Sequence, residues 1–169
     1  MSWVKYITGV VVILILQLLF SEFLNLWPML YIVVIPLVII LLPADTSTYL
    51  LMAAGFGVGL LTDALADGIL GLNAACGTLL GAVKPMIIRP MRKYNMQSEE
   101  FDINNGAFRQ ENLIILLVVS YLVFFVPYVL IDGSGASAFV YIVVRILINV
   151  AVNVVLAYLL LKLWIRRFF

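Results

Sequence analysis

The chain has 169 residues, of which 65% are hydrophobic and only 11% are charged, and its mean hydropathy is +1.18. A soluble globular domain carries about a quarter charged residues, so this chain has too few to cover a water-facing surface and must have the bilayer as its solvent. The net charge of +1 gives no sign of a nucleic-acid partner, and the absence of histidine removes the commonest metal ligand.

Six apolar stretches follow one another, and each is compared with the roughly 20 residues that a spanning helix needs. The first, about 4–20, has the charge and apolar core of a signal peptide but no small-x-small cleavage site, so we interpret it as a retained span. The second, about 29–42, is short and has Pro36 in its middle, which predicts a kinked helix. We expect the remaining spans at about 49–66, 69–88, 113–131 and 138–163.

Basic residues predict how these spans are oriented. With the N-terminus in the cytoplasm, the lysines and arginines close to the spans all fall inside, including those of the polar loop 89–112. Five or seven spans would break this segregation. The sequence therefore predicts an all-α integral membrane protein, with 1–169 forming a single bundle of about six transmembrane helices and both termini inside.

Glycine and alanine are concentrated in the central stretch from Gly55 to Gly81. Gly55, Gly57 and Gly59 form GxGxG, which is not the GxGxxG of nucleotide-binding folds and has no strand–helix unit around it. Gly55 and Gly59 lie one helical turn apart, as do Gly77 and Gly81, and this spacing lets two membrane helices approach closely. We expect these four glycines to mark a close helix–helix contact.

Polar residues inside the spans are candidates for function, because ionisable groups in a membrane are costly and are usually paired or face water. Asp63 and Asp67 lie four residues apart near the end of the third span, and Arg145, Asn149 and Asn153 share one face of the last. For the acids, a solvated helix end, an ion pair with Arg145 and a cation site stay open. Arg145 could instead extend to the interface, and the asparagines would bond across helices or line a polar interior.

A second candidate group is basic and follows the fourth span: Lys84, Arg89, Arg92 and Lys93. We interpret it as a topology signal in contact with lipid headgroups, with a docking site for a cytoplasmic protein as the alternative. Cys76 is the only cysteine and is expected to be a small buried thiol. No nucleophile–base pair, metal cluster or phosphate loop emerges, so we expect neither an enzyme nor a bound cofactor or metal.

The central stretch resembles the rod shape-determining protein MreD family, in its Bacteroidetes-like form. WPMLYIVVIPLVIILLP resembles the proline-flanked second span of that family, and GFGVGLLTDALADGILGLNAA resembles its G-x-x-x-G-L-x-x-D segment followed by a leucine–glycine–leucine step. Lys84-Pro85 and Arg89-Pro90 match the basic end of the next helix. The motif residues carried over, without an assigned role, are Gly59, Leu60, Asp63, Leu70, Gly71 and Leu72.

This resemblance implies a non-enzymatic scaffold of the cell-elongation machinery in the bacterial inner membrane. Members of the family accompany MreC, a single-span protein, and link MreB filaments to the RodA–transpeptidase pair that builds lateral peptidoglycan and thereby sets cell shape. The family is similar in fold to the substrate-binding subunits of energy-coupling-factor transporters. The alternative function is such a subunit for a small vitamin-type solute, with Asp63, Arg145, Asn149 and Asn153 lining its pocket.

Overall fold

The computed structural model describes residues 12, 15, 17, 19, 30–43, 45–65, 69–94, 110–133 and 139–168, without the side chains of 91–94, 110 and 163–168. Within these ranges the regular secondary structure is all helical, with no strand. The helices are α2 (Ile35–Leu41), α3 (Thr48–Leu65), α4 (Leu72–Tyr94), α5 (Gln110–Asp132) and α6 (Phe139–Phe168).

Three of these helices are long and apolar enough to cross a membrane: Thr48–Leu65, Glu111–Asp132 and Phe139–Lys162. They correspond to the third, fifth and last predicted spans, and they give the chain the character of a membrane protein. α4 coincides with the fourth predicted span but carries several basic residues in its second half. The first predicted span lies outside the described residues apart from positions 12, 15, 17 and 19, which are helical. The count of six helices and their orientation stay predictions.

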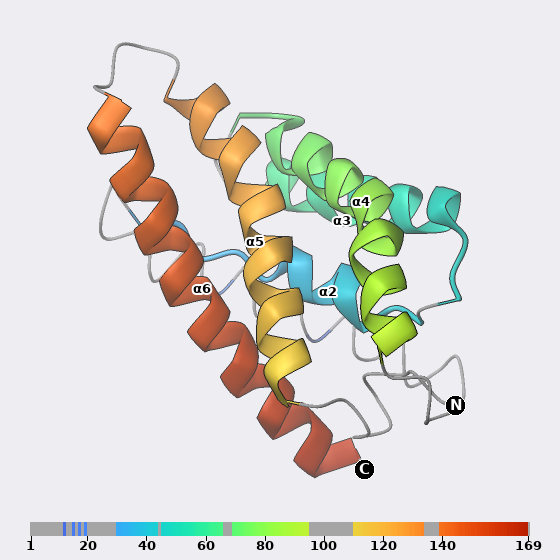
Figure 1. The fold of residues 1–169 in the computed structure, drawn as a ribbon. Helices are drawn as coiled ribbons and strands as arrows, with labels where there is room; N and C mark the ends of the chain where they lie inside the picture. The colour runs from blue at the N-terminus through green and yellow to red at the C-terminus, as the bar shows by residue number, and fades with distance from the viewer. Residues whose placement is uncertain are drawn as a thin grey trace.

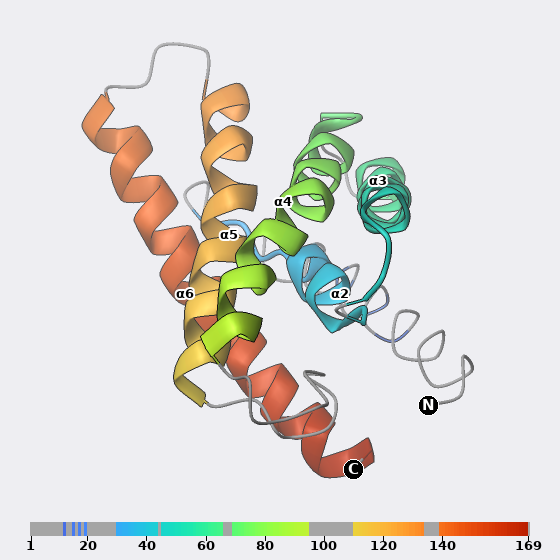
Figure 2. The ribbon, with the colours of Figure 1, turned by 45° about the vertical axis from the view of Figure 1, so that its right-hand side comes forward.

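Two antiparallel helix pairs enclose the short helix α2 (Figures 1 and 2). α5 and α6 form one pair, α3 and α4 form the other, and α2 contacts α3, α4 and α5. Residues Ile35 to Ile40 of α2 are all buried. Opposite them, α5 presents a run of buried aromatic side chains, whose rings contact one another: Tyr121, Phe124, Phe125 and Tyr128. The core therefore forms around α2.

The second predicted span is not a kinked helix, which corrects the expectation for 29–42. Residues 30–34 are non-helical, and the helix begins only at Ile35. Pro36 consequently lies in the first turn of α2, where its missing N–H is one that no helix would bond, instead of in a helix interior. The preceding Ile32 and Val33 are β-branched residues that favour extended backbone.

The contact between α3 and α4 is built on glycine, which confirms the prediction from the spacing. A Cβ added at Gly55 would overlap the carbonyl oxygen of Gly77, and one at Gly81 would lie 2.5 Å from a carbonyl oxygen of α3. One at Gly59 would lie 2.5 Å from backbone atoms of α4. The two backbones therefore touch directly, as in close-packed membrane helices. Gly57 differs, because a Cβ there would meet nothing within 4 Å.

The outer faces of α3 and α6 are apolar and exposed. Large exposed apolar patches are rare on soluble monomers and mark a surface that another apolar phase covers. On α3 they comprise Tyr49, Leu50, Phe56, Leu60, Leu61 and Leu65, and on α6 Phe139, Val140, Val143, Val144, Leu147, Ile148, Val152, Val155 and Leu159. A lipid environment accounts for both faces.

Glycine-to-alanine substitutions at two neighbouring positions of α3 test this packing. We expect Gly55→Ala to destabilise the protein by about 1–3 kcal/mol, because the added methyl group overpacks the contact with α4. Gly57→Ala is the matched control, and we expect it to be neutral or to stabilise the helix by about 0.5–1 kcal/mol, since it reduces only backbone entropy. Thermal melts of the purified protein followed by circular dichroism measure both. Equal effects of the two substitutions would contradict the close contact.

Candidate functional site

The interior polar side chains of the described bundle bond mainly to backbone groups of other segments. Three places receive them: the non-helical residues 30–34, the beginning of α4, and the end of α2. A fourth polar contact, an ion pair, lies between α5 and α6. These four places contain most of the residues that the sequence singled out, but with partners that the sequence did not predict.

On one edge, residues 30–34 form hydrogen bonds with side chains of α6 and α5. The Asn149 Oδ1 accepts from the backbone N–H of Tyr31 at 2.7 Å, and the Asn153 Oδ1 accepts from that of Val33 at 2.7 Å. The Asn153 Nδ2 donates to the carbonyl oxygen of Tyr31 at 2.9 Å, and the Tyr121 hydroxyl donates to that of Val33 at 3.0 Å. The two asparagines thus bond across the bundle, as expected, although their partner is backbone outside any helix.

The other edge of the same residues is bonded by Gln17. Its Nε2 donates to the carbonyl oxygen of Ile32 at 3.1 Å, and its Oε1 accepts from the backbone N–H of Val34. Odd-numbered residues therefore bond to one side and even-numbered residues to the other, which is the alternation of an extended chain. Val34, with φ of −102° and ψ of −6°, already turns the chain into α2. Non-helical backbone at membrane depth is tolerated only where protein groups satisfy it, and these side chains do so.

Asp63 bonds to the beginning of α4. Its carboxylate accepts from the backbone N–H groups of Gly71 at 2.9 Å, Asn73 at 3.1 Å and Ala74 at 3.1 Å, and from the Asn73 Nδ2 at 2.9 Å. The first N–H groups of a helix lack partners within it, and a negative charge there is also favoured by the helix dipole. Asp63 is only 5% exposed, so it caps α4 from the neighbouring helix. Gly71, with φ of +91°, supplies the turn that this requires.

This geometry corrects two interpretations of Asp63. It is neither a solvated helix end nor the partner of Arg145. Asp67, the second acid of the predicted pair, lies outside the described residues. Among the residues that the structure does describe, no group of three His, Cys, Asp or Glu side chains could hold a metal ion.

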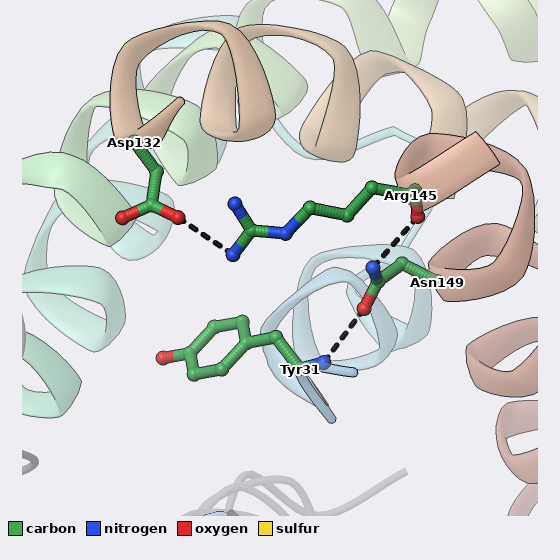
Figure 3. A network of polar contacts seen from close by, with 4 residues as sticks. All are labelled: Tyr31, Asp132, Arg145 and Asn149. Carbon is green, nitrogen blue, oxygen red and sulfur yellow. Dashed lines mark hydrogen bonds and ion pairs between the residues drawn. The ribbon is translucent and has the colours of Figure 1, made fainter. Parts of the chain in front are cut away.

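Arg145 pairs with Asp132, the last residue of α5. The Arg145 Nη2 lies 2.6 Å from the Asp132 Oδ2, and the two side chains are 13% and 29% exposed. Figure 3 shows the Arg145 side chain reaching from α6 toward Asp132, with Asn149 below it. The Asn149 Nδ2 donates to the Arg145 carbonyl oxygen at 2.7 Å while its Oδ1 accepts from Tyr31. The pair thus joins α5 and α6 near the turn between them. Whether Arg145 extends to the interface stays a prediction.

Tyr31 connects these contacts. Its ring stacks on that of Tyr128 in α5, with centroids 4.9 Å apart and an interplanar angle of 11°. Its hydroxyl accepts from the Asn73 Nδ2 at 3.0 Å, and Asn73 also donates to Asp63. Residues 30–34, the cap of α4 and the α5–α6 hairpin therefore form one continuous polar network.

Lys84 bonds to the end of α2. Its Nζ donates to the carbonyl oxygens of Ile39 at 2.8 Å and Leu42 at 2.7 Å, and the side chain is 1% exposed. A positive charge is favoured at a helix C-terminus, where carbonyl oxygens lack partners. This corrects the interpretation of Lys84 as a headgroup or cytoplasmic contact. Arg89 is exposed and compatible with that role, and the side chains of Arg92 and Lys93 are not described.

Several members of the network were missed from the sequence: Gln17, Tyr31, Asn73, Tyr121 and Asp132. Gln17 and Asn73 were recognisable as polar residues within apolar surroundings. The predicted fifth span ended at 131 and left Asp132 to the following turn, whereas Asp132 is the last residue of α5; its partner could not be deduced from spacing along a helix. No family model, curated protein or solved structure matches this chain.

The cap of α4 is tested by replacing Asp63. We expect Asp63→Asn to lower the free energy of unfolding by about 1.5–3 kcal/mol, because the charge-assisted bonds to the backbone are lost and an NH₂ group faces N–H donors. Thr62→Val is the matched control, since the Thr62 hydroxyl is buried beside Asp63 and donates only within its own helix, to the Val58 carbonyl oxygen. Thermal melts compare the two. A loss for Thr62→Val as large as that for Asp63→Asn would contradict the cap.

The ion pair is tested by charge exchange. We expect Asp132→Arg and Arg145→Asp each to destabilise the protein and the double variant to recover about 0.5–3 kcal/mol of coupling, as contacting charges do. The control is Asp63→Arg combined with Arg145→Asp, for which no recovery is expected because these two side chains have other partners. Recovery with Asp63 but not with Asp132 would reverse the assignment.

Proposed function

We propose that this chain is a non-enzymatic membrane scaffold of the MreD type, working in the cell-elongation machinery of a bacterial inner membrane. In this proposal it crosses the membrane six times with both termini inside, and it binds an MreC-like single-span protein. Through that partner it couples MreB filaments to the RodA–transpeptidase pair that builds lateral peptidoglycan. The likeness of the stretch from Trp27 to Arg92 to that family supports the proposal.

The observation that favours a scaffold is the use of the interior polar side chains. Asp63, Lys84, Asn149 and Asn153 each bond to backbone groups of this same chain. Arg145 pairs with Asp132. A site for a small solute instead presents a few polar groups that converge on an enclosed space. The residues proposed for such a pocket are thus engaged in holding the bundle together.

The broken second span needs the same comparison, because solute transporters also contain discontinuous helices. In transporters the freed helix ends and unwound backbone point at the substrate or its coupling ion. Here side chains of Gln17, Asn153 and Tyr121 occupy the backbone groups of residues 30–34. This break therefore favours a rigid interior over a substrate site.

The exposed apolar faces of α3 and α6 supply surfaces on which a partner's single span could replace lipid. Helices in a membrane associate through shape and small residues instead of through the hydrophobic effect. Gly57 faces outward from α3 with open space before it, beside the exposed Phe56 and Leu60. Bulky substitutions on such a face should weaken a partner while leaving the bundle intact.

Copurification combined with depletion tests the proposed function. We expect the tagged full-length chain to retain an MreC-like single-span protein through detergent purification, and we expect its depletion to turn rod-shaped cells round with vitamin uptake unchanged. Gly57→Leu should reduce the amount of copurified partner without changing the melting temperature, since it adds bulk only on the outer face. Leu159→Ala, on the exposed face of α6, serves as the comparison.

The opposite results would support the solute-binding subunit. These are stable binding of a vitamin-type molecule by the isolated protein, and loss of uptake with normal rod shape on depletion. Either result, together with failure to retain a single-span partner, would reject the scaffold.

A further inference from the structure

The arrangement of hydrogen bonds around residues 30–34 has a regularity that the individual contacts do not reveal. The Asn153 carboxamide donates to the carbonyl oxygen of Tyr31 and accepts from the N–H of Val33. The Gln17 carboxamide donates to the carbonyl oxygen of Ile32 and accepts from the N–H of Val34. Each amide thus bridges a carbonyl oxygen and the N–H two residues further along.

This is the bonding pattern that one residue of a neighbouring strand makes in a parallel β-ladder with its own N–H and C=O groups. A carboxamide carries a donor and an acceptor on one group, so each side chain supplies the two bonds that one residue of a neighbouring strand would supply. Asn153 does so on one edge of residues 30–34 and Gln17 on the other. The extended segment therefore has bonded edges on both sides without being part of a sheet.

We propose that residues 30–34 form a conformational clasp, in which the carboxamides of Gln17 and Asn153 hold the extended chain before Val34, together with the Val34 N–H, from opposite edges and release it together. Through these hydrogen bonds, the segment joins two parts of the chain that are far apart in sequence: Gln17 of the first predicted span and Asn153 of α6. Opening the contact on one edge frees the backbone to rotate, and the bonds on the other edge are then lost as well.

Two further observations support joint release. Val33 is fully buried and Val34 is fully buried, so neither can turn toward solvent while the clasp is closed. The backbone also has no simple helical alternative, because Pro36 would clash with the carbonyl of Ile32 if the helix extended backwards through it. A segment without an internal hydrogen-bonding alternative depends on the side chains of both edges at once.

A thiol-accessibility cycle on the purified full-length chain tests the clasp. Val33→Cys is placed in a Cys76→Ala background, and its rate of maleimide labelling is measured alone, with Gln17→Leu, with Asn153→Leu, and with both. We expect slow labelling of the starting protein, an increase of about tenfold or more for each single substitution, and little further increase for the double variant. Ser120→Ala is the control, because its buried hydroxyl has no hydrogen-bond partner in the described structure, and it should leave the rate unchanged.

Circular dichroism accompanies each measurement, so that loss of the helices is distinguished from opening of the clasp. If Asn153→Leu does not fold, Tyr121→Phe replaces it in the cycle, since it removes a single hydroxyl from the same edge. If the labelling rate of the double variant rises by the product of the two single-variant increases, the two edges open independently, and this result would overturn the proposal. Unchanged rates in the single variants would overturn it as well.

Discussion

Every backbone N–H and carbonyl group that lies away from water needs a partner, and in this protein that requirement decides where the polar side chains go. Helices satisfy it internally except at their ends and where they are interrupted. The described bundle has such places at residues 30–34, at the beginning of α4 and at the end of α2. Residues 30–34 are bonded by Gln17 and Asn153. Asp63 bonds to the beginning of α4, and Lys84 bonds to the end of α2. The close α3–α4 contact adjoins the cap, because Gly59 packs against Asn73 and Ala74, whose backbone N–H groups donate to Asp63.

The signs of the buried charges follow from these positions. A carboxylate lies at a helix N-terminus and an ammonium group at a helix C-terminus, each matching the partial charge that the backbone presents there. In lipid, a buried charge is usually interpreted as a functional site. Asp63 and Lys84 show a second reason for retaining one: each is buried and supplies the partners that the end of a neighbouring helix lacks. Arg145 and Asp132 serve the α5–α6 hairpin in a related way, as a pair.

The sequence predicted those features that depend on spacing along one element, and it failed where the partner comes from another. The positions of α3, α5 and α6 followed from apolar length, and the glycine contact followed from residues four apart, because both are properties of a single helix. Asp63 and Arg145 were correctly recognised as interior charges, but their depths along the chain suggested a pairing that the fold does not make. Pro36 was compatible with a kink and with a first turn, and only the bonds to residues 30–34 distinguish the two.

The extended segment also changes how far the second apolar stretch can reach. As a continuous helix, the twelve residues 30–41 of this stretch would cover only about 18 Å, well short of the roughly 30 Å hydrocarbon core. With the first few extended at about 3.3 Å per residue and the rest helical, the same stretch reaches about 25 Å. A segment that counts as too short for a transmembrane helix is thus long enough to approach both faces of a bilayer. Residue counts calibrated on helices underestimate the depth of any chain that, like this one, alternates extended and helical backbone.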